Sequence, residues 1–466
     1  VSKYFDRITR PEQILSTLPQ AIQIMLDQAD CGPATISISQ DVQGEAFDYP
    51  KVFFEEEVHE IRRVHPDQIQ IEKAVDVIKK SKQPIIISGG GVLYSEAENE
   101  LSAFAKKHNI PVTTTAMGIG CMDRDDPYNI GPIGGLGVGS ANSLSKDTDL
   151  VISIGTKLSD FTTGSWSNFH NPDFKLISLN TARFDVTKHR ATPIVSDAKI
   201  GLNEISNSLS DWKAPDKWYQ RAKKESKEWD QYVEKQSGPT NQELPSYAQA
   251  IGAVYRNADP SDIVVTAAGG LVGEVVQVWK PKQINTFETE WGFSCMGYEI
   301  SGALGIKMAK PEQDVIVFVG DGSYLLNNSD IYSSVIYEKK LIIVVCDNGG
   351  HMVINRLQLA KGGKEYLSNL KAARATNFVE VDFAKHAASM GAETETVKSA
   401  SELEGAFLRA KKSKKTYVIS LKTHGYEWLE GTAFWESPTL EVYSSEENKK
   451  AHEEHSKGKA RQRHGV

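Results

Sequence analysis

The sequence predicts an α/β protein made of several doubly wound parallel-sheet domains, the first of them incomplete. Three observations support this fold class. Short apolar runs, such as residues 84–88 and 315–319, have the continuous hydrophobicity of strands covered on both faces. Stretches with helical spacing of apolar residues separate these runs, as in repeated βαβ units. The length of 466 residues is enough for about two to four domains.

The first block, residues 1–50, has too few elements to fold alone. Residues 11–28 have the apolar spacing of a helix, and residues 34–39 alternate like a strand. Because one helix and one strand cannot bury a core, we expect this block to be the C-terminal remnant of a larger domain. The start at Val1, without a methionine, fits a domain already in progress.

The remaining chain divides into three further parts. Residues 51–235 are predicted to be a central α/β domain, with a charged helical linker at residues 216–234. Residues 236–430 are predicted to be a second α/β domain, and residues 431–466 a charged tail that is either a solvated helix or disordered. The expected helices are residues 68–81 and 96–108, and the expected strands are residues 84–88, 110–114, 150–154, 175–179, 263–266, 315–319, 341–345 and 416–420.

The composition argues against several classes of function. A net charge of -8 argues against a large basic surface for nucleic acid. No run approaches the roughly 18 apolar residues of a membrane span, and no signal-peptide pattern opens the chain, so we expect a cytoplasmic protein. The four cysteines have no paired spacing, which argues against disulfides or a zinc site and favours small buried side chains in a reducing compartment.

A candidate metal site stands where two strands of the 236–430 domain end. Asp321 follows one apolar run and Asn348 follows the next, across an interval that fits one crossover helix capped by Asn328 or Ser329. In such a unit the strands are parallel, and the tips of neighbouring strands lie about 4.8 Å apart at one edge of the sheet. Open α/β sheets bind ligands at that edge. We therefore expect Asp321 and Asn348 to reach a single cation.

The types of ligand point to Mg²⁺. The set has a carboxylate and an amide oxygen, and it has neither a soft sulfur nor paired imidazoles. Mg²⁺ takes one or two carboxylates together with phosphate oxygens. Gly320 and Gly322 let the backbone approach a bulky anion, and the amides after Gly322 open the next helix, which favours a phosphate. A Gly-Asp-Gly sequence alone is commonly a turn, so the flanking strands and helix carry the prediction.

In this arrangement the residues resemble the cofactor signature of thiamine-diphosphate enzymes of the acetolactate synthase and pyruvate oxidase type. The resemblance implies that Asp321, Asn348 and the backbone carbonyl of Gly350 hold Mg²⁺, which bridges the diphosphate of the cofactor. It also implies that the cofactor is contacted by Gly270, Leu271, Gly320, Gly322 and Ser323.

Residues 291–297 resemble the segment that grips the aminopyrimidine ring in this family. The match makes Met296 the apolar wedge that bends the cofactor, and the carbonyl of Ser294 the acceptor of a hydrogen bond from the ring amine. The bend brings this amine close to the reactive carbon, so that it can take up the proton. For an isolated methionine, ordinary core packing is the more common role.

More specific stretches resemble one branch of the family, which cleaves a carbon–carbon bond of a cyclic 1,2-diketone by hydrolysis in myo-inositol catabolism. They are residues 40–46, 291–299, 322–325 and 355–358. The resemblance implies a polyol diketone substrate, and a homodimer or homotetramer with shared active sites. His351 and Arg356 are candidate substrate contacts, with a structural histidine and a surface ion pair as the respective alternatives.

The glutamate that activates the cofactor in this family has no counterpart that can be assigned. Neither Glu12 nor Glu45 stands in the expected helical context, so we expect this catalytic residue to lie upstream of Val1. The run Gly89-Gly90-Gly91 lacks the full dinucleotide fingerprint, and the central domain is therefore expected to be structural.

Three alternatives remain at this point. One is another thiamine-diphosphate enzyme, an acetolactate synthase or a 2-hydroxyacyl lyase. Another is a non-catalytic protein that only binds the cofactor. The third is a nicotinamide-dependent dehydrogenase, which is disfavoured because no acidic residue stands at the required interval after a GxGxxG motif.

Overall fold

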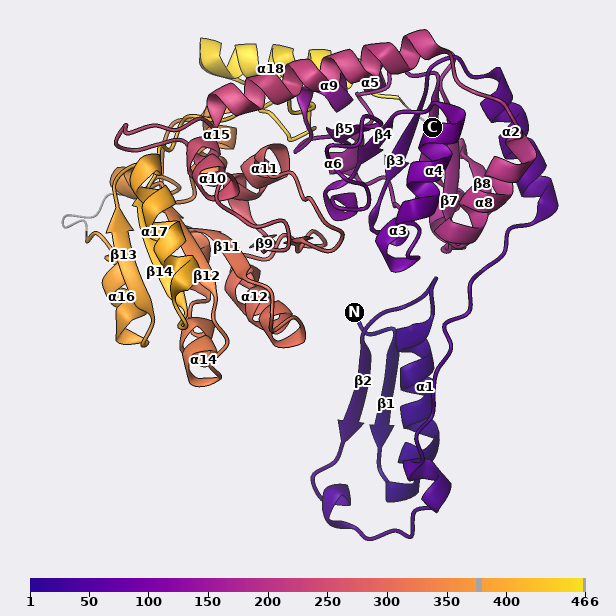
Figure 1. Ribbon diagram of the computed structural model, residues 1–466, viewed down its shortest axis with the longest axis horizontal. Helices are drawn as coiled ribbons and strands as arrows, with labels where there is room; N and C mark the ends of the chain where they lie inside the picture. The colour runs from indigo at the N-terminus through magenta and orange to yellow at the C-terminus, as the bar shows by residue number, and fades with distance from the viewer. Residues whose placement is uncertain (374–378, 464–466) are drawn as a thin grey trace.

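The computed structural model describes residues 1–373 and 379–463. Within these residues the strands form a two-stranded sheet and two six-stranded sheets, and every strand pair is parallel. In Figure 1 the small N-terminal unit hangs below the central sheet, and the C-terminal sheet lies beside the central one. The prediction of parallel-sheet α/β units is confirmed.

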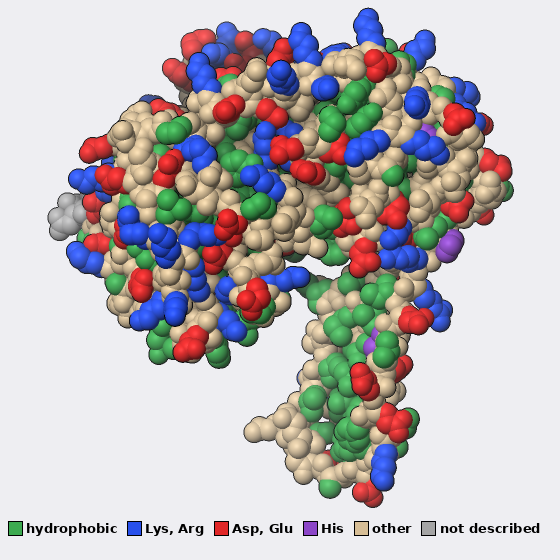
Figure 2. All heavy atoms as spheres, viewed as in Figure 1, with side chains coloured by type: hydrophobic (Ala, Val, Ile, Leu, Met, Phe, Trp, Pro, Cys, Tyr) green, Lys and Arg blue, Asp and Glu red, His purple; other side chains and the backbone are tan. Residues whose placement is uncertain are grey.

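The N-terminal unit contains β1 (Tyr4–Ile8), α1 (Ile14–Leu26) and β2 (Ala34–Ile38). The sequence analysis found α1 and β2 but not β1. Phe5 is 64% exposed and Ile38 is 43% exposed, because two strands and one helix offer no second layer to cover both faces of the sheet. Figure 2 shows hydrophobic side chains over this unit.

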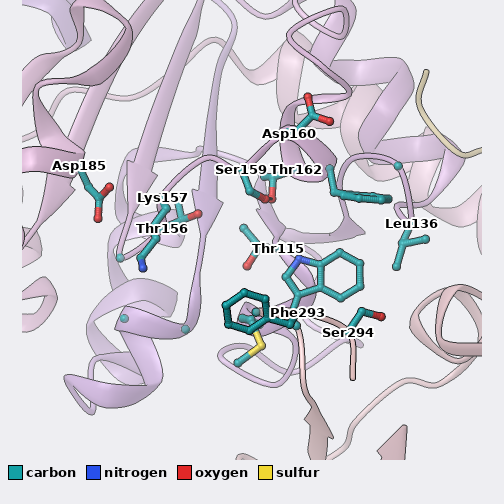
Figure 3. A pocket seen from close by; sticks show the side chains of 18 of the residues that line it. Thr115, Leu136, Thr156, Lys157, Ser159, Asp160, Thr162, Asp185, Phe293 and Ser294 are labelled. Atoms are coloured by element: carbon teal, nitrogen blue, oxygen red, sulfur yellow. Dashed lines mark hydrogen bonds between the residues drawn. The ribbon is translucent and has the colours of Figure 1, made fainter. Parts of the chain in front are cut away.

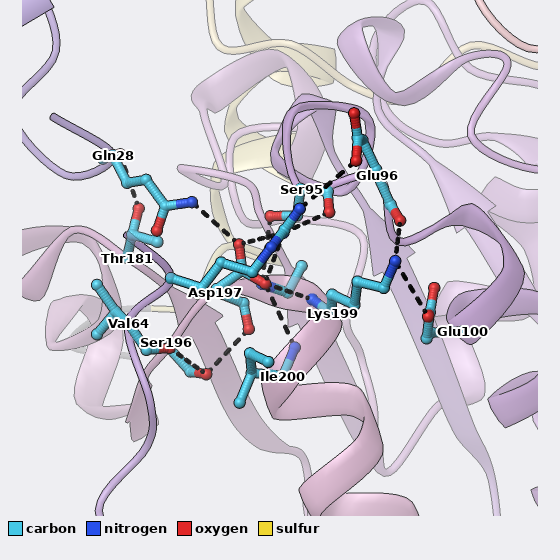
Figure 4. Close-up of polar contacts among 12 residues, drawn as sticks. Gln28, Val64, Ser95, Glu96, Glu100, Thr181, Ser196, Asp197, Lys199 and Ile200 are labelled. Atoms are coloured by element: carbon cyan, nitrogen blue, oxygen red, sulfur yellow. Dashed lines mark hydrogen bonds and ion pairs between the residues drawn. The ribbon is translucent and has the colours of Figure 1, made fainter. Parts of the chain in front are cut away.

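A polar junction centred on Asp197 ties the N-terminal unit to the central one (Figure 4). The carboxylate of Asp197 is fully buried, and it accepts hydrogen bonds from Gln28 at 3.1 Å and Arg63 at 3.0 Å. The hydroxyl of Thr181 donates to the backbone carbonyl of Gln28 at 3.0 Å. Asp197 also caps the following helix through the amide of Lys199. One buried carboxylate thus holds the segment after α1, the segment around Arg63 and the central unit together.

The central sheet has the order β5-β4-β3-β6-β7-β8. Its strands are β3 (Pro84–Ser88), β4 (Val112–Thr114), β5 (Asn129–Pro132), β6 (Leu150–Ile154), β7 (Lys175–Asn180) and β8 (Thr192–Val195). Its helices are α2 (Gln68–Lys80), α3 (Gly90–Tyr94), α4 (Glu98–His108), α5 (Gly139–Asp147), α6 (Asp160–Thr163), α7 (Arg183–Val186) and α8 (Ala198–Leu209). The order of the strands reverses between the neighbouring strands β3 and β6, so the chain leaves these two strands toward opposite edges of the sheet.

The charged stretch expected to be a linker is the helix α9 (Asp216–Gln236), and it is part of the core. Trp218, Trp229 and Val233 are buried in an apolar cluster that also contains residues of both large sheets. The charged residues cover the opposite face of α9, which is why the stretch looked solvated. The helix therefore fastens the two large units to one another.

The C-terminal sheet has the order β10-β9-β11-β12-β14-β13. Its strands are β9 (Ile263–Thr266), β10 (Phe287–Thr289), β11 (Val315–Gly320), β12 (Ile342–Asp347), β13 (Glu393–Val397) and β14 (Tyr417–Lys422). Its helices are α10 (Tyr247–Tyr255), α11 (Gly269–Val278), α12 (Tyr298–Ala309), α13 (Asp321–Leu326), α14 (Asp330–Ile336), α15 (Met352–Ala360), α16 (Phe383–Ser389) and α17 (Ala400–Lys412). Here the order reverses at β9 and β11.

The crossover between β11 and β12 contains two short helices, α13 and α14, where one helix was expected. The backbone at Asn327 is extended, with φ -151° and ψ 96°, and this ends α13. Ser329 precedes α14 without a side-chain capping bond, while the side chain of Asn328 donates to the carbonyl of Tyr324. The crossover is therefore bent, although the strands still lie side by side.

The tail contains the helix α18 (Glu446–Lys459), as one of the two expectations had it. The helix is partly packed, because Ala451 is buried and the amide of Asn448 donates to the carbonyl of Gly362 at 2.8 Å. The last three residues of the predicted tail lie outside the described residues.

Two further expectations concern cysteines and membranes. All four cysteines are free thiols, but Cys31 and Cys295 are exposed, so the expectation of buried side chains holds only for Cys121 and Cys346. Cys31 and Cys295 stand in loops, where no layer covers them. None of the helices in the described ranges has the length and hydrophobicity that a membrane span requires.

Candidate cofactor site and active-site cavity

The predicted metal ligands come together at the ends of two paired strands. Gly320 of β11 is the register partner of Cys346 of β12. Asp321 and Asn348 follow within two residues of these partners, so both stand at the same edge of the C-terminal sheet. The backbone amide of Gly350 donates a hydrogen bond to the carboxylate of Asp321, which brings the third predicted ligand residue to the same place.

Asp321 and Asn348 are arranged as ligands of a cation. Asp321 is 4% exposed, and burial, reinforced by the neighbouring carboxylate of Asp347, raises its pKa to about 7. The amide nitrogen of Asn348 donates to the hydroxyl of Tyr247 at 2.6 Å. This bond directs the other end of the amide away from Tyr247, and the Asn348 Oδ1 atom is buried without a hydrogen-bond partner in the described part of the chain.

A buried carboxylate beside an unpartnered amide oxygen fits a hard divalent cation, which would satisfy both. The backbone carbonyl of Gly350 also fits the role of a cation ligand. Gly350 is bridged to Asn369, but the two hydrogen bonds of this bridge are made by the backbone of Gly349 and His351, so they do not use the Gly350 carbonyl. No group of three or more His, Cys, Asp or Glu side chains is placed to hold a metal among the described residues. The side-chain oxygen of Asn348 and the backbone carbonyl of Gly350 are therefore needed, beside Asp321, to complete a set of cation ligands.

Gly322 is enclosed by two of the predicted site residues. A Cβ atom at this position would lie 2.8 Å from Cε1 of His351 and 3.2 Å from the Cε atom of Met296. Met296 is 36% exposed, so its side chain is not packed in the core. The Gly-Asp-Gly turn, the wedge candidate and His351 thus form one cluster, and a larger residue in place of Gly322 would have to displace the side chains of His351 and Met296.

Two glutamates that the sequence analysis did not assign hold the loops of this cluster. Glu299 is 1% exposed and accepts hydrogen bonds from the amides of Ala268 and Gly297, and from the hydroxyl of Ser323. It therefore joins the loops that follow β9, β10 and β11. The carboxylate of Glu290 accepts from the amides of residues 293 and 295, at 2.9 Å and 2.6 Å.

The remaining predicted cofactor residues lie on the same loops. The hydroxyl of Ser294 donates to the carbonyl of Ala267 at 3.1 Å, and Ser294 has a positive φ of 53°. Leu271 is 2% exposed, with its side chain in the apolar core, so only its backbone is available to a ligand. Gly270 and Ser294 line the cavity described next.

A cavity of about 1990 Å³ lies between the N-terminal, central and C-terminal units. Figure 3 shows residues of two of these units around it, with Thr115, Thr156 and Lys157 from the central unit and Phe293 and Ser294 from the C-terminal one. Asp321 and Asn348 stand outside its lining. The cavity reaches the predicted site through Gly270 and Ser294, which follow β9 and β10.

Arg356 projects from α15 into the wall of this cavity. Its guanidinium lies over the ring of Trp428, 5.1 Å from the ring centre, and burial lowers its pKa. Arg356 makes no salt bridge within the ranges that the structure describes, so its environment differs from the surface ion pair that the sequence left open.

The glycines of the central unit are packed against one another. A Cβ atom on Gly91 would lie 2.6 Å from the Cα atom of Gly155, so the loops after β3 and β6 touch. This contact gives a structural reason for the glycines. The neighbouring Thr156 and Lys157 line the cavity.

Residues 71–205 match the family model described as the thiamine pyrophosphate enzyme central domain, and residues 267–421 match the C-terminal domain that binds thiamine pyrophosphate. The second match contains the Gly-Asp-Gly turn, Met296 and Asn348. The chain belongs to the thiamine pyrophosphate enzymes. It is thus an enzyme with thiamine diphosphate as cofactor, as predicted, and the dehydrogenase and non-catalytic alternatives are set aside.

Similar curated proteins are named 3D-(3,5/4)-trihydroxycyclohexane-1,2-dione hydrolase. The protein of Clostridium tetani is 36% identical over 463 residues, which are 92% of this chain and 72% of the relative. The protein of Halalkalibacterium halodurans is 36% identical over 482 residues, 97% of this chain and 75% of the relative. The protein of Lacticaseibacillus casei is 35% identical over 486 residues, 97% of this chain and 74% of the relative.

Proposed function

We propose that this enzyme uses thiamine diphosphate and Mg²⁺ to open a cyclic 1,2-diketone by hydrolysis. The substrate is 3D-(3,5/4)-trihydroxycyclohexane-1,2-dione, the product is 5-deoxyglucuronate, and the reaction belongs to myo-inositol catabolism. One observation carries the proposal: relatives with this name match at 36% identity over 92% of the chain.

The proposal assigns the metal to Asp321, Asn348 and the carbonyl of Gly350. The geometry that supports it is the buried Asp321 carboxylate beside the unpartnered Oδ1 atom of Asn348. Tyr247 is a positioning residue in this scheme, because its hydroxyl holds the amide nitrogen of Asn348. The bond leaves the oxygen as the free end for a cation.

Contacts with the cofactor are proposed for Gly320, Gly322, Ser323, Gly270, the backbone of Leu271, the carbonyl of Ser294, and the side chain of Met296. When bound, thiamine diphosphate supplies a nucleophilic carbon and an electron sink for the broken bond. The chain's own task is to hold this group with loops that Glu299 ties together, and to enclose the substrate in the adjoining cavity.

Substrate contacts are proposed for His351, which lies beside Gly322, and for Arg356 in the cavity wall. A guanidinium suits the carbonyl and hydroxyl oxygens of a polyol diketone because it presents several donors in one plane. The proposal also includes the four-part division at residues 1–50, 51–235, 236–430 and 431–466, a homodimer or homotetramer, and a cytoplasmic location.

The test is product analysis with the full-length protein, thiamine diphosphate, Mg²⁺ and the cyclic dione. We expect a product heavier than the dione by one water, with one carboxylate and one aldehyde, identified by mass spectrometry and NMR. Pyruvate in place of the dione is the control, and it should give no acetolactate. Acetolactate from pyruvate, with the dione left intact, would replace the proposal by a synthase of the same family.

A further inference from the structure

One face of α11 is turned toward the cavity. Gly270, Gly273, Glu274 and Gln277 recur at helical spacing and all line it. The amide of Gln277 is engaged, since it donates to the carbonyls of Gly137 at 2.8 Å and residue 430 at 3.2 Å. Glu274 is the carboxylate on this face, one turn beyond the predicted cofactor residue Gly270.

The two oxygens of Glu274 have different surroundings. The backbone amide of Leu429 donates to Oε1 at 2.9 Å. The Oε2 atom is buried, and it has no hydrogen-bond partner in the part of the chain that the structure describes. Because the amide marks Oε1 as an acceptor, a proton on Glu274 resides on Oε2. An unpartnered buried carboxylate oxygen is costly, and its position beside a cavity points to a ligand as the missing partner.

The charged side chain that interacts electrostatically with Glu274 is Arg356 of α15, which lines the same cavity. Burial raises the pKa of Glu274 to about 7, while Leu429 and Arg356 act in the opposite direction. Trp428 fixes this arrangement: Arg356 lies over its ring, and a Cβ atom on Gly270 would be 2.1 Å from it. Near neutral pH, Glu274 can therefore both give and take a proton.

We propose that Glu274 is a catalytic acid–base residue that exchanges a proton with the substrate in this cavity, while Arg356 holds an oxygen of the same molecule. This inference rests on the proposed hydrolysis of a 1,2-diketone. In that reaction, R–CO–CO–R′ and water become R–COOH and R′–CHO, with no net oxidation.

Glu274 has two proton transfers to serve in each turnover. The bond between the two carbonyl carbons breaks, the water oxygen joins one carbon, and a proton joins the other to form the aldehyde. As a carboxylate, Glu274 accepts the proton that the water loses. As an acid, it returns a proton to the aldehyde carbon, so its own charge is restored at the end.

The test compares Glu274→Gln with the wild type in the full-length holoenzyme. Glutamine keeps an oxygen that accepts from the amide of Leu429, so this backbone contact is retained, but glutamine cannot exchange a proton. We expect kcat on the dione to fall by about 10²–10⁴-fold, as for loss of a general acid–base group. The limb of the pH profile near neutral pH should disappear, while KM and the calorimetric Kd for thiamine diphosphate stay within about threefold, which is under 1 kcal/mol.

The matched control is Glu288→Gln, because burial also raises the pKa of Glu288, which stands on β10 outside the cavity lining. Infrared titration without cofactor gives a second readout: the protonated-carboxyl band that is lost near neutral pH should be smaller in Glu274→Gln, while the part from Asp321, whose pKa is also raised to about 7, remains. An unchanged kcat and pH profile, or a tenfold loss of cofactor affinity, would overturn the inference while the proposed function stands. A wild-type enzyme that leaves the dione intact removes the proposed function and the inference together.

Discussion

Replacing Glu274 by glutamine should change the way in which stability depends on pH. Burial raises the pKa of Glu274 from 4.5 to about 7 in the folded protein. Between these values the unfolded chain has lost the proton and the folded protein keeps it, so the free energy of unfolding falls as the pH rises. The stabilising contribution is complete below pH 4.5 and is lost as the pH passes through about 7.

The size of the effect follows from the two pKa values. At about 1.4 kcal/mol per unit of pKa, the difference between 4.5 and about 7 corresponds to about 3 kcal/mol. Glutamine does not titrate, and it retains an acceptor for the Leu429 amide. The free energy of unfolding of Glu274→Gln, measured relative to that of the wild type, should therefore rise by about 2–3 kcal/mol as the pH increases from 5 to 8.

The assay is urea denaturation at several pH values across this range, followed by tryptophan fluorescence, to which Trp428 beside Glu274 contributes. Glu243→Gln removes a negative charge from an exposed position and controls for general charge effects. A stability difference between Glu274→Gln and the wild type that stays constant within about 0.5 kcal/mol from pH 5 to pH 8 would refute the reasoning. The carboxyl would then titrate alike in the folded and unfolded chains.

Three further predictions concern the metal ligands and the junction. Asp321→Ala should abolish Mg²⁺-dependent binding of thiamine diphosphate in calorimetry, and an unchanged affinity would refute the metal assignment. Tyr247→Phe removes the acceptor of the Asn348 amide, a bond of about 1 kcal/mol, and should weaken Mg²⁺ binding about fivefold; equal affinity would show that the amide needs no such support. Asp197→Ala removes a helix cap and the buried partner of Arg63, which keeps only the exposed Glu96 as an ion-pair partner within the described residues, so urea denaturation should show a loss of about 2–4 kcal/mol. Asp197→Asn, which can still cap, should cost less, and equal losses in both variants would contradict the capping role.

The sequence predicted the interior strands of both large sheets and missed the edge strands. Strands such as β6 and β11 are buried on both faces, and their continuous apolar runs are visible without a structure. The missed strands β5, β8, β10 and β13 all stand at the edges of their sheets. β8 contains Pro193, and β13 has the sequence ETETV. An edge strand tolerates proline and charge because one side of it has no strand to pair with.

The candidate site divides in the same way between local and distant signals. Asp321 and Asn348 were predicted because a strand, a turn and a strand-end polar residue are all local features of the chain. Tyr247 is 101 residues away from Asn348, and Leu429 is 155 residues away from Glu274. Neither pairing leaves a pattern in the sequence, because each contact forms only when the fold brings distant segments of the chain together. The same holds for Glu299, whose partners come from three separate loops.

The topology explains why the cavity lies where it does. In each large sheet the strand order reverses at a central pair of strands, β3 and β6 in one and β9 and β11 in the other, and such points open a crevice at the carboxyl ends of the strands. The cavity is lined by the loops after β3, β6 and β9, so it occupies the space between the two crevices. In the central unit Gly91 and Gly155 close the crevice by direct contact. We propose that the C-terminal unit holds the cofactor and that the central unit forms the facing wall, so that Glu274 and Arg356 stand on the cofactor side of the cavity.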